Sequence, residues 1–357
     1  MEEQRDLLGM LDLMIRPGFC VKESKIVKVN QAAESFFLAC GMDVTDFLLT
    51  GKEEYQEFTG GCLYLTLTLS GKALGASVTR MQDVDVFLLE QDAENQELRA
   101  MALAARELRE PLTNVMATAN RLFSPPQLQE EEANRNQLAR MNRSLFQIMR
   151  ILGNMSDADR YTAVTRQETV AIGEELDEIF RKSQALIAQA GIHLEYAPLT
   201  EDIYCLADKE QLERAVLNML SNAVKFTPAQ GTIEASLTRK GRMLRLSIQD
   251  SGDGIAESIR SNVFHRYLRQ LTIEDNRYGI GLGMVLIRSA AAHHGGTVLI
   301  DHPAEKGTRI TMTMEIRQNP GNMLRSPMAR VDYAGGFDHA LLELSESLPP
   351  SVYEKEV

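Results

Sequence analysis

Residues 217–227 read LNMLSNAVKFT, and this stretch decides how the carboxyl-terminal half of the chain folds. Its apolar residues recur at helical spacing and belong to a helical pattern over residues 209–226. Asn218, Asn222 and Lys225 follow at i, i+4 and i+7, so they share one face of that helix. On its own, such a polar face is typical of a solvated helix surface.

Two glycine-rich stretches follow this helix. Residues 250–255, DSGDGI, end a strand expected over residues 242–249, and Gly252 and Gly254 allow the backbone to turn closely there. Residues 279–284, GIGLGM, open a helix that continues to residue 293. Glycines ahead of a helix expose backbone N–H groups and direct the helix dipole at an anion. Taken singly, the two stretches are equally typical of a turn and of a helix packed against a strand.

In order and spacing, the three stretches resemble the N, G1 and G2 boxes of the sensor histidine kinase ATPase family, of the GHKL type. Residues 263–267, VFHRY, are similar to its F box, and the resemblance covers residues 95–317. It implies that ATP and Mg²⁺ bind. Asn222 would give a side-chain oxygen to Mg²⁺, Lys225 a charge near the phosphates, and Asp250 an acceptor for the adenine amino group. The implied ATP-binding residues are Asn218, Asn222, Lys225, Asp250, Gly252, Gly254, Ile255, Arg266, Gly279, Gly281, Leu282 and Gly283.

Two long helices are predicted over residues 93–157, broken by Pro125 and Pro126. Apolar residues recur at alternating spacings of three and four in both, which indicates heptad seams. The first seam runs from Met101 to Leu122, and the second consists of Leu138, Met141, Leu145, Ile148, Leu152 and Met155. Two such hairpins can bury their seams as a four-helix bundle, so we expect a homodimer or a heterodimer with another kinase.

Residues 106–113, RELREPLT, lie on the first helix and resemble the H-E-L-R-T-P-L-T box of histidine kinases, with Arg106 in the place of the phosphate-accepting histidine. Guanidinium stays protonated and is a poor nucleophile, whereas neutral imidazole offers a lone pair. Glu107 occupies the general-base position without a partner to activate, and Glu110 would repel a phosphoryl group. Self-phosphorylation on the usual position is therefore doubtful. His293 and His294 are interpreted as structural.

Composition limits the other function classes. The net charge of −12 argues against a nucleic-acid surface, which needs clustered Lys and Arg. No apolar run approaches the roughly 18 residues of a membrane helix, and the acidic amino terminus has no signal-peptide pattern, so a cytoplasmic protein is expected. The four scattered cysteines are interpreted as buried, reduced thiols.

The predicted fold class is multidomain α+β. Residues 1–90 read as a small domain, with a strand hairpin expected over residues 19–30 and an alternating strand over residues 62–69. Its strand and helix order resembles a PAS sensor, with an interaction domain that binds no ligand as the alternative. Residues 93–157 form the helical hairpin, and residues 165–317 an α/β sandwich that carries the ATP site. The tail, residues 318–357, is treated as separate, with one short amphipathic helix over residues 338–348.

Three functions remain open. The first is a histidine-kinase-family signal transducer that binds Mg-ATP and phosphorylates a histidine in trans, with a response regulator as a further candidate partner. The second is a catalytically silent pseudokinase that acts as an ATP-dependent dimeric regulator. The third, ranked last, is another member of the ATPase superfamily, such as an anti-sigma kinase or a gyrase-like enzyme. Anti-sigma kinases lack the long paired helices, and only about forty residues follow the ATP site.

Overall fold

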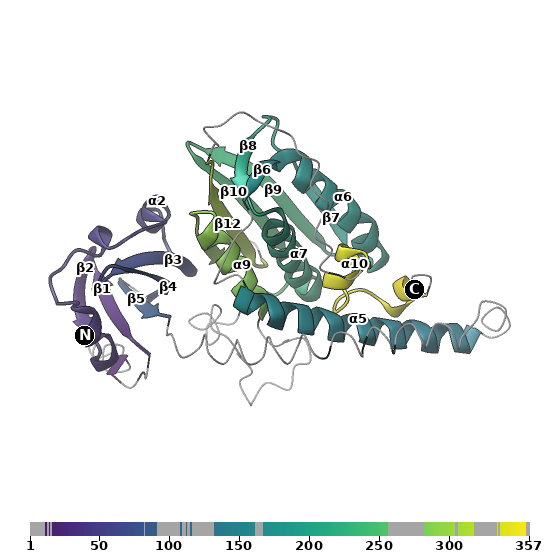
Figure 1. Cartoon of the computed structure of the whole chain (residues 1–357), viewed down its shortest axis with the longest axis horizontal. Helices are drawn as coiled ribbons and strands as arrows, with labels where there is room; N and C mark the ends of the chain where they lie inside the picture. Colours follow the sequence, from purple (N-terminus) through teal and green to yellow (C-terminus); the bar gives the residue numbers. More distant parts are fainter. Residues whose placement is uncertain are drawn as a thin grey trace.

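The computed structural model describes most of the chain outside the first bundle helix and the G2 box (Figure 1). The described residues are 11, 12, 14, 16–81, 83–90, 108, 112, 115, 132–160, 167–255, 282–303, 306–317, 334 and 336–354, without the side chains of 132–134 and 157–160. Arg106, Glu107, Glu110, Arg266, Gly279 and Gly281 lie outside them. Within them, no helix is both long enough and apolar enough to cross a membrane.

The amino-terminal half is an antiparallel sheet in the order β2-β1-β5-β4-β3. Its strands are β1 (Gly18–Lys22), β2 (Lys25–Val29), β3 (Cys62–Leu69), β4 (Lys72–Met81) and β5 (Val84–Leu89). The alternating residues of β3 confirm the strand predicted there, and β1 and β2 confirm the predicted hairpin. Between β2 and β3 lie the 3₁₀ helices η1 (Gln31–Phe36) and η2 (Val44–Asp46) and the helix α2 (Lys52–Gln56). Cys20, Cys62 and Cys205 are buried as expected, but Cys40 is exposed.

The carboxyl-terminal half continues this sheet in the order β11-β12-β10-β9-β7. These strands are β7 (His193–Ala197), β9 (Thr232–Lys240), β10 (Met243–Asp250), β11 (Val298–Asp301) and β12 (Arg309–Glu315). Only β7 and β9 pair in parallel among them. Two short strands, β6 (Glu168–Ala171) and β8 (Tyr204–Ala207), form a separate ladder that the sequence pattern did not predict.

Three helices cover one face of this half of the sheet (Figure 1). They are α6 (Ile172–Gln189), α7 (Lys209–Phe226) and α9 (Leu282–His293), and their apolar faces share one core with the strands. The bounds of α7 coincide with the helical pattern predicted for residues 209–226. Asp208 caps α7 by accepting a hydrogen bond from Gln211 N at 3.1 Å, which fixes where the helix begins.

The two halves meet along a pair of strands far apart in sequence. Antiparallel pairing of β3 with β11 joins them into one ten-stranded sheet, with Tyr64 opposite Val298. Arg288 of α9 reinforces this junction, because its Nη1 lies 2.6 Å from Glu90 Oε1 and its guanidinium lies over the ring of Tyr64. The sequence predicted a sensor-like domain separate from the ATP domain and gave no sign of this pairing.

The helix α5 (Glu132–Arg160) runs along the carboxyl-terminal half (Figure 1). Its buried face includes Phe146 and Met149, which join the core of that half. The predicted heptad seam is only partly buried, since Leu138, Leu145 and Leu152 are buried but Ile148 is exposed. One face of α5 therefore packs within its own chain.

The carboxyl-terminal tail is not separate, contrary to the prediction from sequence. It forms α10 (His339–Glu343) and the 3₁₀ helix η3 (Pro350–Tyr353), which lie against α5, α6 and α7 (Figure 1). The apolar side chains of the predicted amphipathic helix explain this packing, because Leu341, Leu342, Leu344 and Leu348 are all buried in the shared core.

Candidate functional site

The three polar residues predicted on one face of α7 have different surroundings. Asn218 is fully buried, and its Nδ2 donates to Arg214 O at 2.9 Å and to Glu343 Oε2 at 3.4 Å. Asn222 Nδ2 lies 3.6 Å from Met284 Sδ at the start of α9. Lys225 Nζ lies 3.1 Å from Glu346 Oε2. The face therefore points toward α9 and the tail, rather than into solvent.

Asp250 ends β10 and is almost completely buried. Its Oδ1 accepts hydrogen bonds from Gly252 N at 2.9 Å and from Thr308 N at 3.2 Å. Burial raises the pKa of this carboxyl, and the two backbone hydrogen bonds oppose that rise. The arrangement fixes the orientation of the carboxylate. Gly254 has a φ of +81°, as the predicted close turn requires, and Ile255 ends the described stretch partly buried against the core.

The amino terminus of α9 lies directly against α7. A Cβ at Gly283 would come within 2.8 Å of Asn218 Oδ1, so the approach needs glycine or a shift of that side chain. Leu282 is buried with Val285, and Met155 of α5 packs against this pair. Of the four predicted G2-box residues, Leu282 and Gly283 are thus beside the α7 face, while Gly279 and Gly281 lie outside the described residues.

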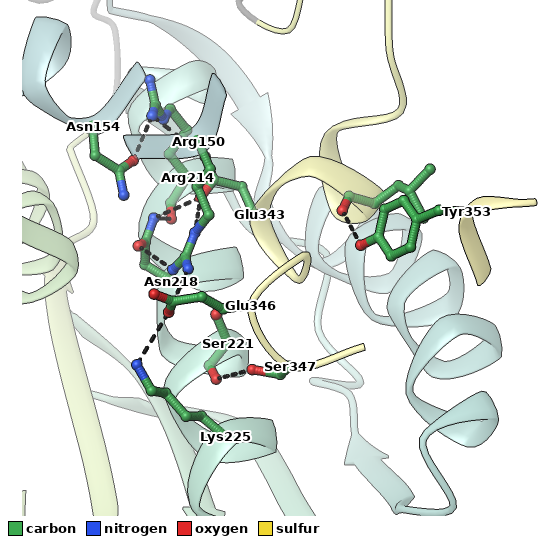
Figure 2. Close-up of polar contacts among 11 residues, drawn as sticks. Arg150, Asn154, Arg214, Asn218, Ser221, Lys225, Glu343, Glu346, Ser347 and Tyr353 are labelled. Atoms are coloured by element: carbon green, nitrogen blue, oxygen red, sulfur yellow. Dashed lines mark hydrogen bonds and ion pairs between the residues drawn. The ribbon is translucent and has the colours of Figure 1, made fainter. Parts of the chain in front are cut away.

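Two arginines and two glutamates at this face were not predicted from sequence (Figure 2). Arg150 reaches from α5 and Arg214 from α7, and both contact Glu343 of the tail. Arg150 Nη2 also lies 3.4 Å from Asn218 Oδ1. Charged side chains are rarely so buried unless they are paired. The one sequence signal was position, because Arg214 precedes Asn218 by a single helical turn.

His294, directly after the end of α9, makes contacts that hold two helices together, which agrees with its structural interpretation from sequence. His294 is 3% exposed, its Nδ1 lies 2.7 Å from Ala290 O, and its Nε2 accepts from Asp208 N at 3.0 Å. These contacts require a neutral ring with the proton on Nδ1. Burial lowers the pKa of His294 accordingly. The ring thereby ties α9 to the start of α7.

The side chains of this region fit a magnesium nucleotide. Asp250 offers a buried, oriented acceptor for an exocyclic amino group, and Asn222 offers an amide oxygen of the kind that Mg²⁺ binds. Arg150, Arg214 and Lys225 bring three positive charges to the face between them. Among the described residues, no group of three or more His, Cys, Asp or Glu side chains could hold a metal by itself. A Mg²⁺ ion held there by Asn222 would complete its coordination with phosphate oxygens of the nucleotide and with water.

Comparison with known families gives a match, over residues 207–318, to the family described as histidine kinase-, DNA gyrase B- and HSP90-like ATPase. The chain is 28% identical over 262 residues to the adaptive-response sensory kinase SasA of Synechocystis sp., covering 70% of this chain and 68% of that protein. It is 25% identical over 228 residues to the sensor histidine kinase RppB of the same organism, covering 63% of this chain and half of that protein.

Among solved structures, full-length ShkA in complex with AMPPNP covers 62% of this chain and 46% of its own, with 23% identity and a TM-score of 0.47. The chain spans about two thirds of the first relative and half of the second.

Proposed function

Since residues 207–318 match the histidine kinase-, DNA gyrase B- and HSP90-like ATPase family in a homologue of sensor histidine kinases, we propose that this protein is a cytoplasmic signal transducer that binds ATP with Mg²⁺. The observation that carries the proposal is the shared α7 face, with Asn218, Asn222 and Lys225 beside the start of α9. The buried, oriented carboxylate of Asp250 supports it from β10.

Each part of the nucleotide has side chains suited to it. Asp250 would accept the adenine amino group, which favours adenine over guanine because guanine carries a carbonyl oxygen at that position. Asn218 and Lys225 would bind phosphate oxygens, and Asn222 would bind Mg²⁺. When bound, Mg²⁺ would neutralise phosphate charge and make the γ-phosphate a better electrophile.

Phosphotransfer would then go to a histidine on another chain. Arg106 stands in the acceptor position and offers no lone pair, so the chain's own bundle would not accept the phosphate in the usual way. We propose that it pairs as a dimer, either with itself or with another histidine kinase, and that a response regulator receives the phosphate downstream.

A second candidate is a catalytically silent regulator that binds ATP without transferring phosphate. Arg106 favours it, together with Glu110, which would repel a phosphoryl group. In this reading nucleotide binding changes only the conformation of the dimer or its partner.

The test is incubation of the purified chain with γ-labelled ATP and Mg²⁺, alone and with a candidate partner kinase whose own ATP site is disabled. Label on the partner that is acid-labile and base-stable is phosphohistidine and supports transfer in trans. Acid-stable label indicates Ser or Thr instead. ATP binding without any label favours the silent regulator.

A matched pair of variants checks that the label depends on this site. Asn222→Ala removes the expected Mg²⁺ ligand and should abolish the label. Asn136→Ala alters an exposed asparagine of α5 and should leave it intact. Equal labelling in both variants would contradict the assignment of Asn222.

A further inference from the structure

The tail is held against the carboxyl-terminal half by apolar side chains at both of its ends. Leu341 and Leu342 of α10 are each 2% exposed. Tyr353 of η3 is fully buried; its ring contacts Phe146 of α5, and its hydroxyl donates to Leu341 O at 2.9 Å. Burial of large apolar side chains such as these stabilises the docked tail. The segment between these anchors, residues 343–347, is consequently fixed over the α7 face.

Glu343 brings the first carboxylate to that face (Figure 2). It is fully buried, with Oε2 at 3.2 Å from Arg150 Nε and Oε1 at 3.3 Å from Arg214 Nη2. Its Oε2 also accepts from Asn218 Nδ2 at 3.4 Å. A tail carboxylate therefore contacts Asn218, the first of the three polar residues predicted on this face of α7.

Glu346 brings the second carboxylate to Lys225, about two turns further along α7 than Asn218. Its Oε2 lies 2.8 Å from Arg150 Nη1 and 3.1 Å from Lys225 Nζ. Burial acts to raise the pKa of Glu346, but the charges of Arg150 and Lys225 outweigh it and hold that pKa below its usual range. Glu346 is thus held as an anion, as a phosphate oxygen would be.

We propose that residues 343–347 compete with the phosphates of the nucleotide for this face, so that the docked tail holds the ATP site closed. The inference rests on the proposed ATP binding at Asn218, Asn222 and Lys225, of which two already hold tail carboxylates. Phosphate and carboxylate are recognised by the same charge-assisted hydrogen bonds, and two anionic groups cannot share one set of donors.

The contact is built in a way that permits exchange. Ser221 Oγ and Ser345 Oγ are buried there without a hydrogen-bond partner in the described part of the chain, and a buried polar atom without a partner destabilises the contact. Buried ion pairs also stabilise little in net terms, because desolvation offsets the attraction. A ligand that satisfies the same cations can therefore displace residues 343–347.

A purely structural contact is the main alternative. In that case, weakening the interaction of Glu346 would lower the stability of the domain and leave nucleotide affinity unchanged or reduced. Competition predicts the opposite change in affinity, so the two explanations separate in a binding measurement.

The experiment uses the full-length chain with Glu346→Gln, which removes one tail anion while keeping the size of the side chain. Glu346 is 29% exposed at its side chain, so this change is milder than one at the fully buried Glu343. Glu354→Gln is the matched control, because Glu354 is an exposed carboxylate of the same tail. The dissociation constant of trinitrophenyl-ATP is measured with Mg²⁺ and confirmed by displacement with ATP.

We expect Glu346→Gln to lower the dissociation constant at least fivefold and Glu354→Gln to leave it within twofold of the wild type. An unchanged or higher constant for Glu346→Gln overturns the competition. If neither wild type nor variants bind the nucleotide, the proposed ATP site itself fails, which is a distinct result.

Hydrogen exchange on the wild-type protein gives a second, independent readout. Competition is reciprocal: if the docked tail weakens ATP binding by some factor, saturating Mg-ATP must weaken docking of the tail by the same factor. Leu342 N and Leu344 N, which donate to Asp338 O and Ala340 O within α10, should exchange faster with nucleotide present. Unchanged or slower exchange at these amides would overturn the inference even if Glu346→Gln binds more tightly.

Discussion

Replacing Gly307 with alanine should damage the fold and the candidate adenine position together. Gly307 has a φ of +94°, and a Cβ built there lies 1.8 Å from the backbone oxygen of Asp250. The obstacle is main chain, so no side-chain rotation relieves it. Asp250 N also donates to Thr308 O at 2.9 Å, which means that relief of the clash must move the end of β10 away from the start of β12.

The magnitude follows from two terms. A residue with a Cβ in the left-handed region costs about 1–2 kcal/mol relative to glycine. Forcing extra volume into a packed site typically costs about 1–3 kcal/mol more. Gly307→Ala should therefore destabilise the protein by about 2–5 kcal/mol. Gly191→Ala is the matched control, because Gly191 has a φ of +73° and a Cβ at that position would meet no heavy atom within 4 Å, so only the first term applies.

Urea unfolding of the wild type and both variants gives their free energies of unfolding, and titration with trinitrophenyl-ATP gives their dissociation constants for nucleotide. Gly307→Ala should lose at least tenfold in affinity, since its strain moves the Asp250 carboxylate, whereas Gly191→Ala should bind as the wild type does. Equal destabilisation by the two variants would refute the assigned clash. Normal nucleotide affinity in a destabilised Gly307→Ala protein would refute the role given to Asp250.

Three further changes test other parts of the molecule. Asp250→Asn should reduce the preference for ATP over GTP by about tenfold or more in competition binding, while Asp253→Asn, at an exposed aspartate in the same turn, should not. Burial lowers the pKa of His294 below the ordinary 6.5. The stability that the neutral ring contributes is therefore present above pH 6.5 and is lost as the pH falls below that value. The melting temperature should consequently fall less between pH 7.5 and pH 5.5 in His294→Gln than in the wild type. Arg288→Met should lower the free energy of unfolding by about 1–3 kcal/mol and speed hydrogen exchange at the β3–β11 junction; the loss is smaller than for a fully buried pair because Glu90 is 32% exposed. The control, Arg242→Met, breaks an ion pair of an arginine that is 79% exposed and should change little. Equal effects of the two variants would contradict the role given to Arg288 at the junction.

Local periodicity predicted many of the elements, because it reflects which side chains face the core. The alternation in residues 62–69 gave β3, and the helical pattern in residues 209–226 gave α7, with the same bounds as in the structure. The short strands β6, β7 and β8 were not predicted from the sequence.

The candidate site was predicted unevenly. Asn218, Asn222 and Lys225 follow from helical spacing together with the family resemblance, and their common orientation toward α9 and the tail agrees with that spacing. Arg150 and Glu343 were missed because they come from segments far from the motif in sequence. Arg106 lies outside the described residues, so the labelling experiment is what tests its effect on phosphotransfer.

The sequence by itself determined elements whose formation depends on neighbours a few residues away, among them α5, α7, α9, several strands and the close turn at Gly254. Only the tertiary structure decided that β3 continues the sheet at β11 and that the acidic tail meets the cations of α5 and α7. The physical reason is that these contacts are not selective in sequence. The unpaired backbone groups of an edge strand can bond to any other strand, and any Glu can pair with any Arg. The packing of the whole chain selects which strand and which carboxylate make these contacts.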